Sequence, residues 1–175
     1  MFPVLKQMTV DEFLSWAEGK EGRWELHDGV PVMISSAESV MTAPERAAHI
    51  RTKFRAAKAL DDAVTTRGLP CEVFADGMGI RVDAWTTYEP DASVRCGPRT
   101  PGDVIEIADP VIVVEVLSPS TAAVDHGRKL NGYFSLPSVQ HYLILDPERG
   151  VVGVRRRDRD PSADGRRSAA RSAGI

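Results

Sequence analysis

One apolar stretch constrains the fold of this chain more than any other part of the sequence. Residues 110–120 read PVIVVEVLSPS, and the first eight of these positions are apolar except for Glu115. A continuous apolar run of this length is typical of a strand covered on both faces. The chain therefore needs a sheet with apolar layers on both sides, and a reason to bury a carboxylate.

Glu115 is the exception in this run. Side chains alternate along a strand, so Glu115 shares one face with Val113 and Leu117. An ionised carboxylate without a partner costs several kcal/mol in apolar surroundings, so its site must supply a cation, hydrogen bonds or a proton. A glutamate near a strand end can also point to solvent or pair with an arginine, and the run alone leaves both alternatives open.

A second carboxylate, Asp91, strengthens the functional interpretation. In YEPDASV it follows Pro90, which suits the first residue of a strand. The 24 residues from Asp91 to Glu115 allow one strand, a loop and a return strand, so that the two carboxylates can meet. A Pro-Asp pair is also common in turns and is a weak signal when taken alone.

The pattern of apolar residues predicts an α+β or mixed α/β domain with one central sheet, covering residues 1–156. Thr9 and Glu12 suit a capping box, and the Asp28-Gly29 pair predicts a β-hairpin. The expected elements are a helix at about 9–18, a hairpin at 23–34, a helix at 43–66, strands at 71–75, 78–83 and 90–95, a strand at 111–117, a helix at 121–135, and strands at 139–145 and about 150–156.

The helix expected at 43–66 has two distinct faces. Its apolar stripe is expected to consist of Ile50, Phe54, Ala57 and Val64. Another face carries three basic residues, Arg51, Arg55 and Lys58. The pattern allows either a solvated face or a contact with nucleic acid there.

Charge and composition limit the class of protein. The formal net charge of the chain is −3, but residues 155–175 hold seven arginines against three acidic residues, which leaves −7 for the rest. An acidic body has no general affinity for nucleic acid, so such binding needs local basic patches. No stretch approaches the roughly 18 to 20 apolar residues of a membrane span, and the N-terminus lacks a signal-peptide pattern, which predicts a cytoplasmic protein without membrane contacts.

Two further features lie outside the predicted site. Cys71 and Cys96 have no CxxC partner and no secretory context, which predicts that both are reduced. The segment 157–175 is rich in Arg, Ser and Ala and has no large apolar residue before Ile175, so we expect it to be disordered.

Four segments carry a resemblance to a known family. They are, in order, RWELHDGVPVMI, YEPDASV, PVIVVEVLSPST and DHGRKLNGYFSLPSVQHYLILDP. Together they resemble the Uma-two family of restriction-endonuclease-like proteins, a branch of the PD-(D/E)XK nuclease superfamily. The resemblance covers about residues 9–156 and is most specific over 88–147. It implies a restriction-endonuclease-like core with the active site where its second and third strands diverge.

The resemblance also implies a divalent-metal site. Asp91 and Glu115 would be the metal ligands, and the backbone carbonyl of Val116 would complete the protein's share. The expected cofactor is Mg²⁺ or Mn²⁺, because Mg²⁺ is typically held by one or two carboxylates together with water and substrate phosphate.

The chain departs from the superfamily pattern at one position. A lysine is expected two residues after the glutamate, and Leu117 stands there instead. Lys129, in DHGRKLNGY on the following helix, is the nearest replacement, and migration of the lysine to this helix fits the family. The alternative for Lys129 is an exposed i,i+4 pair with Asp125, worth about 0.3 to 0.5 kcal/mol.

Three more residues are candidates for the site. The family carries an acidic residue in the hairpin, so Glu25 can bind metal through water or orient Lys129, although a plain surface position is equally compatible with the pattern. His49 and Lys53 lie one turn apart on the long helix and can contact substrate phosphate. A lone histidine on a helix is more often structural or exposed.

Two functions remain open at this point. The first is a metal-dependent endonuclease that hydrolyses phosphodiester bonds, with DNA as the expected substrate, using Asp91, Glu115 and Lys129. The second is a catalytically inactive module of the nuclease fold that binds nucleic acid or a protein partner, and Leu117 in the lysine position favours it. A homodimer is compatible with either function.

Overall fold

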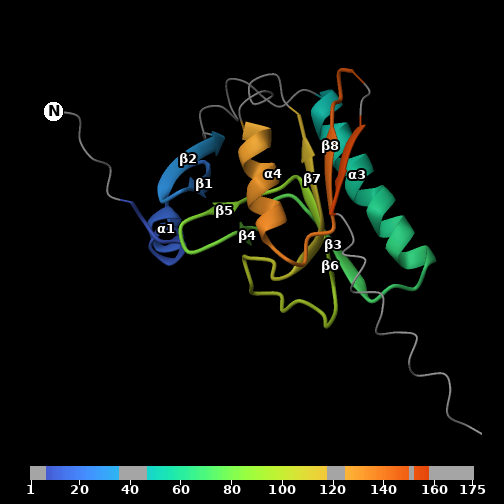
Figure 1. Cartoon of the computed structure of the whole chain (residues 1–175), viewed down its shortest axis with the longest axis horizontal. Coiled ribbons are helices and arrows are strands. Elements are labelled where there is room, and N and C mark those ends of the chain that lie inside the picture. The colour runs from blue at the N-terminus through green and yellow to red at the C-terminus, as the bar shows by residue number, and fades with distance from the viewer. Residues whose placement is uncertain (1–6, 36–46, 118–124, 150–151, 158–175) are drawn as a thin grey trace, which may run out of the picture.

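A computed structural model describes residues 7–35, 47–117, 125–149 and 152–157 (Figure 1). Its helices are α1 (Val10–Ala17), α3 (Ala47–Thr66) and α4 (Asp125–Ser135). Its strands are β1 (Arg23–His27), β2 (Val30–Ser35), β3 (Cys71–Ala75), β4 (Ile80–Arg81), β5 (Thr87–Tyr88), β6 (Ala92–Cys96), β7 (Pro110–Val116), β8 (His141–Leu145) and β9 (Val152–Arg156). The predicted mixed α and β architecture is confirmed.

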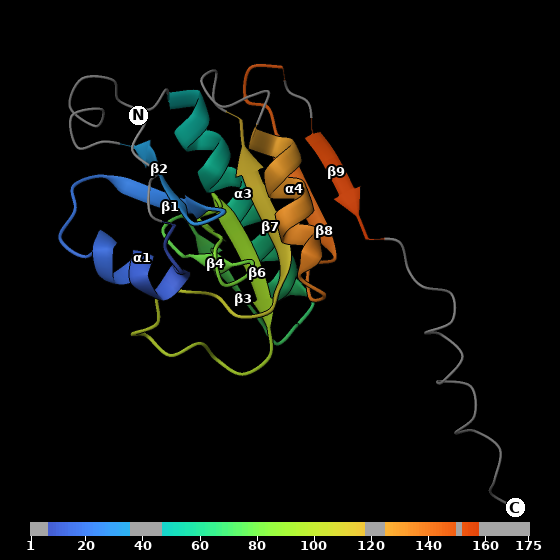
Figure 2. The ribbon, with the colours of Figure 1, turned by 60° about the vertical axis from the view of Figure 1, so that its left-hand side comes forward.

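A five-stranded mixed sheet in the order β3-β6-β7-β8-β9 forms the centre of the molecule. β7 pairs antiparallel with β6 and parallel with β8, and α4 lies between the two parallel strands in the chain. α3 covers one face of this sheet and α4 covers the other (Figure 1, Figure 2). The prediction of a strand covered on both faces is therefore confirmed for β7.

Each face of the sheet has its own apolar core. On the α4 face, Val113 belongs to a buried cluster with Tyr133 and Tyr142. On the α3 face, Val114 packs with Ala57 and Ala92. Complete burial of one such valine contributes roughly 1.5 to 3 kcal/mol to folding. The alternation along β7 directs Glu115, like Val113, toward α4.

A second, smaller sheet corrects the expectation of one central sheet. It has the order β2-β1-β5-β4, with β1 pairing antiparallel to both β2 and β5. The sequence pattern predicted a single strand at 78–83, but only Ile80–Arg81 is strand, and the unpredicted β5 joins it to the hairpin. Local periodicity cannot identify two-residue strands, because long-range pairing defines them.

The N-terminal predictions hold in detail. Thr9 and Glu12 form the expected capping box at the start of α1. Asp28 and Gly29 both have positive φ, 50° and 80°, as a two-residue hairpin turn of type I′ requires. Val10 and Phe13 of α1 pack against Leu26 of β1. The hairpin that carries Glu25 is thus fixed to the rest of the domain.

Part of the apolar stripe predicted for the long helix is wrong. Ala57 is buried, but Ile50 and Phe54 are 52% and 66% exposed. Near the start of α3, the polar side chains of His49 and Lys53 face the sheet. The sequence pattern had predicted that the neighbouring apolar row would face it.

The prediction of two reduced cysteines is also wrong. Cys71 and Cys96 stand directly opposite each other on β3 and β6 and form a disulfide. The pairing follows from strand register, which the spacing of the two residues in the sequence did not reveal.

Some predictions fall on residues that the structure does not describe. The segment predicted to be disordered lies outside the described residues from 158 onward, as do residues 43–46, where the long helix was expected to begin. Among the helices that are described, none combines the length and apolar character needed to cross a bilayer.

Candidate active site

The two predicted metal ligands both lie at the C-terminal end of β7. Asp91 directly precedes β6, whose Ala92 pairs with Val114 of β7. The Val116 N–H donates a 2.6 Å hydrogen bond to Asp91 Oδ2. The Asp91 carboxylate therefore lies at the residue that follows Glu115, and its negative charge is one of the causes that raise the pKa of Glu115.

Glu115 points into a buried polar cluster on the α4 side. Glu115 is 7% exposed, and its Oε1 accepts hydrogen bonds from the Tyr133 hydroxyl at 3.0 Å and from Lys129 Nζ at 3.3 Å. Burial raises the pKa of Glu115 to about 8; Lys129 opposes this shift, whereas the charges of Asp91 and Glu25 add to it. The two alternatives that placed Glu115 in solvent or against an arginine are excluded.

Glu25 lies in the same cluster and is not a surface residue, since it is 1% exposed. Its Oε1 accepts from Lys129 Nζ at 2.8 Å and from the Glu89 N–H at 2.9 Å, and its Oε2 accepts from His27 Nε2 at 2.8 Å. Burial alone would raise the pKa of Glu25, but the hydrogen bond from His27 and the charge of Lys129 outweigh it and lower the pKa. Glu25 is therefore held as an anion.

Lys129 is the centre of what we call the α4-side cluster, which consists of Glu25, His27, Glu115, Lys129 and Tyr133. The lysine is 6% exposed and lies 5.6 Å from the centre of the Tyr88 ring. This burial excludes an exposed lysine of the kind expected in an i,i+4 pair. The side chain of Asp125, the other member of that pair, lies outside the described residues.

A second group of charges, the α3-side cluster, consists of Arg23, Lys53, Asp76 and Asp91. Lys53 Nζ lies 2.8 Å from Asp91 Oδ1 and 3.5 Å from Asp76 Oδ2. Arg23 pairs with Asp76. Burial would raise the pKa of Asp76, but the Arg23 hydrogen bond and the charge of Lys53 lower it overall. Asp76 and Arg23 are both more than a third exposed, so this cluster reaches the surface.

His49 joins α3 to the end of β7. Its Nε2 lies 3.0 Å from the Val116 carbonyl oxygen, the group predicted as the third metal ligand. Because a carbonyl only accepts, the His49 Nε2–H donates this bond. The structure thus brings all the predicted residues to one strand end: Glu115, Lys129 and Glu25 on the α4 side, and Asp91, Val116, His49 and Lys53 on the α3 side.

The donor set fits a hard divalent cation. Two carboxylates and one carbonyl, all oxygen donors, are present at this strand end, since Asp91 accepts from the Val116 N–H and Glu115 precedes it. Mg²⁺ is commonly held by one or two carboxylates with the remaining positions taken by water. In the described part of the chain, no three side chains of His, Cys, Asp or Glu are grouped closely enough to hold a metal ion by themselves. The fit therefore depends on Asp91, Glu115 and the Val116 carbonyl.

Sequence reasoning did not assign His27, Asp76 or Arg23 to this region, and it considered Tyr133 only as a residue that packs on the stem of Lys129. His27 is two residues from Glu25, and the period of two along a strand places both side chains on one face. Tyr133 is one turn after Lys129, which places both on one face of α4. These two spacings are signals that the sequence contained, whereas Asp76 and Arg23 are brought together only by the fold.

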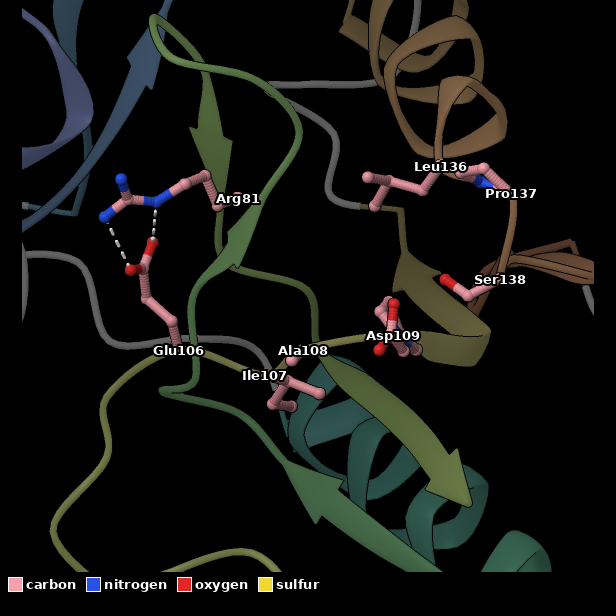
Figure 3. Close-up of a pocket in the computed structure, with 9 residues that line it drawn as sticks. Arg81, Glu106, Ile107, Ala108, Asp109, Leu136, Pro137 and Ser138 are labelled. Carbon is pink, nitrogen blue, oxygen red and sulfur yellow. Dashed lines mark hydrogen bonds and ion pairs between the residues drawn. The ribbon is translucent and has the colours of Figure 1, made fainter. Parts of the chain in front are cut away.

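A separate pocket lies at the opposite end of β7, next to its first residue, Pro110. It has a volume of about 330 Å³ and extends between Arg81, Asp109 and Ser138 (Figure 3). Arg81 forms a 2.8 Å ion pair with Glu106 at its edge. None of the predicted site residues lines this pocket.

Comparison with known proteins places the chain in a family. A family model named Uma2 and described as "Putative restriction endonuclease" matches residues 10–169. The chain belongs to the Uma2 family. This membership confirms the resemblance found in the sequence and supports a nuclease role.

Relatives and a solved structure agree with the family and the fold. Two uncharacterized proteins of Synechocystis sp., slr1290 and sll1609, are 32% and 26% identical to this chain over 79% and 81% of its length, covering 68% and 76% of their own. A crystal structure titled as a putative nuclease belonging to DUF820 from Anabaena variabilis aligns with a TM-score of 0.64 and 18% identity, over 87% of this chain and 82% of that one. This Uma2 chain therefore shares the fold of that protein.

Proposed function

We propose that this protein is a metal-dependent endonuclease that hydrolyses phosphodiester bonds in DNA. The observation that carries the proposal is the hydrogen bond from the Val116 N–H to Asp91, beside a Glu115 that contacts a buried lysine. Two carboxylates and one ammonium from three distant segments thus share one strand end. Family membership and the fold support the same reaction class.

Asp91, Glu115 and the Val116 carbonyl are the groups that would hold Mg²⁺ or Mn²⁺. When bound, the cation polarises the scissile phosphate and lowers the pKa of a bound water. Glu115 has a pKa of about 8 because of its burial, so it must release its proton before it can act as an anionic ligand. A nearby cation favours that release.

Lys129 takes the place of the lysine that is missing at Leu117. Glu25, which is itself fixed by His27 and the Glu89 N–H, holds Lys129 Nζ at 2.8 Å. This second carboxylate keeps the ammonium in place when Glu115 turns to other partners. An ammonium fixed at this strand end can stabilise the negative charge that develops on the phosphate during attack.

Lys53 and His49 are positioned to receive the substrate from the α3 side. Lys53 neutralises Asp91 at 2.8 Å, and His49 donates to the Val116 carbonyl at 3.0 Å. Both contacts involve atoms that would bind the cation. Once Asp91 and Val116 have that partner, the two side chains become available for substrate phosphate.

A nicking assay tests the proposal. Purified protein with Mg²⁺ or Mn²⁺ is expected to nick supercoiled plasmid DNA, and Asp91→Asn, which keeps the size of the side chain, is expected to remove the activity. Arg95→Gln, on the strand β6 that follows Asp91, is a matched control outside the site and should leave the nicking rate unchanged. Equal nicking by wild type and Asp91→Asn would show that a contaminant cuts, and would overturn the proposal.

The second candidate is an inactive module of the same fold that binds nucleic acid or a protein. One observation favours it: Asp91 Oδ1 already has a cationic partner in Lys53, so the site is neutralised internally. Calorimetry separates the candidates. Binding of Mn²⁺ that is lost in Glu115→Gln supports the enzyme, whereas no Mn²⁺ binding supports the module.

A further inference from the structure

The outer face of α3 carries a surface that neither the packing of the described residues nor the proposed reaction uses. Phe54 and Ile50, one turn apart, are 66% and 52% exposed, although the helix buries its opposite face against the sheet. Isolated apolar residues on a surface are ordinary. An exposed phenylalanine stacked one turn after an exposed isoleucine is a small apolar platform.

Positive charges flank this platform. Arg51 and Arg55 are exposed and lie one turn apart in the adjacent row of the helix surface. From residue 47 to 58 the helix has two arginines, two lysines and no acidic residue, whereas Asp61 and Asp62 are the charged residues of its remainder. The positive charge is therefore concentrated in the N-terminal half of α3, in a chain whose net charge is −3.

That half of α3 is the one beside the candidate active site. His49 and Lys53, on its inward rows, contact Val116 and Asp91. The N-terminal end of α3 and the C-terminal end of β7 lie at the same end of the molecule (Figure 1, Figure 2). The rows formed by Ile50 with Phe54 and by Arg51 with Arg55 thus begin next to the site and lead away from it.

We propose that this surface binds an unpaired stretch of the nucleic-acid substrate next to the scissile phosphate, which rests on the nuclease function proposed above. Phe54 stacks on an exposed base, and Arg51 and Arg55 contact the phosphates on either side of it. Bases in a duplex are already stacked on each other and offer no face to a convex helix. The two arginines can bind the phosphates of a duplex, but Phe54 has no base to stack on there. Stacking of a base on an aromatic side chain contributes about 1 to 3 kcal/mol.

A second copy of the chain is the other occupant to consider. A two-fold contact through Phe54 would bring the same surface of both copies together. Because residues 47–58 of the helix include basic but no acidic residues, such a contact would bring like charges of the two copies close together, which is repulsive. A single nucleic-acid strand has phosphates that can bind the row of Arg51 and Arg55, and flat bases that can pack on the row of Ile50 and Phe54.

Fluorescence anisotropy in EDTA tests this proposal without any cleavage. The probes are a labelled single-stranded DNA oligonucleotide of mixed sequence and the same strand in a duplex. Phe54→Leu keeps an apolar side chain but removes the ring, and it is expected to weaken single-strand binding about 5- to 100-fold with little change for the duplex. Arg55→Gln is expected to weaken binding of both probes and to reduce the salt slope by roughly 0.7 to 0.9.

Arg67→Gln is the matched control, because Arg67 is an exposed arginine beyond the other end of α3, where it donates to the Ala63 carbonyl. It should leave the affinity for single strands within about twofold of wild type. Equal affinity of wild type and Phe54→Leu for the single strand would overturn the proposal, as would a concentration-dependent dimer in sedimentation that Phe54→Leu dissociates. Because EDTA removes the metal, this assay measures binding separately from cleavage. A protein that binds single-stranded DNA through Phe54 but does not cleave DNA when metal is added contradicts only the nuclease function.

Discussion

The two sides of the end of β7 handle charge in different ways. On the α4 side, Glu25, Glu115 and Lys129 are all at most 7% exposed, and each contacts another member of the cluster. On the α3 side, Lys53 and Asp91 are somewhat more exposed, and Asp76 reaches the surface. Both lysines contact two acids, but Asp76, one of the partners of Lys53, is 38% exposed, so water can replace a contact of Lys53 more readily than one of Lys129.

This difference suggests a division of labour within one site. The α4-side cluster holds a buried ammonium, and the α3-side cluster holds one that a metal cation would displace under the proposed function. Of the two acids proposed as metal ligands, Glu115 belongs to the first side and Asp91 to the second. Four predictions test whether the two sides really differ.

The largest expected effect is the loss of Lys129. Lys129→Ala leaves the Glu25 carboxylate and the Glu115 carboxyl group buried without the lysine that they share, and should lower the free energy of unfolding by about 3 to 5 kcal/mol. Urea denaturation measures this. Lys58→Ala, which removes an exposed lysine, should cost about 1 kcal/mol or less. Similar losses in the two variants would contradict a special role for the buried lysine.

The second prediction concerns pH. The pKa of Glu115 is about 8 in the folded protein and about 4.5 for an ordinary glutamate, as in the unfolded chain. At a pH between these two values, the folded protein keeps a proton that the unfolded chain has lost. The stabilisation that this proton provides is fully present below the pKa of the unfolded chain. As pH rises toward 8, the free energy of unfolding falls by up to about 1.4 kcal/mol per pH unit. Denaturation in EDTA from pH 5 to 8 should show this decline, and Glu115→Gln should flatten it. An unchanged slope in Glu115→Gln would show that other groups cause the decline.

The third prediction uses metal as the probe. Mn²⁺ at one hundred times its dissociation constant should raise the free energy of unfolding by about 2.7 kcal/mol. Asp91→Asn should abolish this gain, and binding should be tighter at pH 8 than at pH 6 because Glu115 must lose its proton. Thermal unfolding with and without Mn²⁺ measures the gain. If Asp91→Asn is stabilised as much as wild type, the metal binds elsewhere.

The smallest expected effect is that of Lys53. Lys53→Met should lower the free energy of unfolding by about 1 to 2 kcal/mol, less than Lys129→Ala, because its partner Asp91 also accepts the Val116 N–H. Calorimetry should show tighter Mn²⁺ binding by this variant, since the competing ammonium is gone. A loss of stability as large as that of Lys129→Ala would mean that the two sides are alike.

The sequence allowed most of this site to be predicted, since a buried strand with one carboxylate demands a partner. Burial explains why Glu115 was identifiable, and strand periodicity explains why it points toward α4. The partners themselves were harder to find. Lys129 and Glu25 were assigned through a family resemblance, and the pairing of Lys53 with Asp91 depends on how α3 docks against the sheet.

The failures have a common physical cause. Ile50 and Phe54 were assigned to the core because periodicity identifies an apolar row but not the element that covers it. Cys71 and Cys96 were predicted to be reduced because strand register is a long-range property. In each case the answer depended on contacts between residues far apart in the chain, which local patterns do not contain.

The most direct test of the central claim is a crystal of the full chain soaked in Mn²⁺, with anomalous difference density as the measurement. We expect one strong peak within coordination distance of Asp91, Glu115 and the Val116 carbonyl, with Lys53 moved away from Asp91 and Lys129 still bound to Glu25. A peak elsewhere, or none at this strand end while Lys53 remains on Asp91, would contradict the claim that the two acids form a metal site.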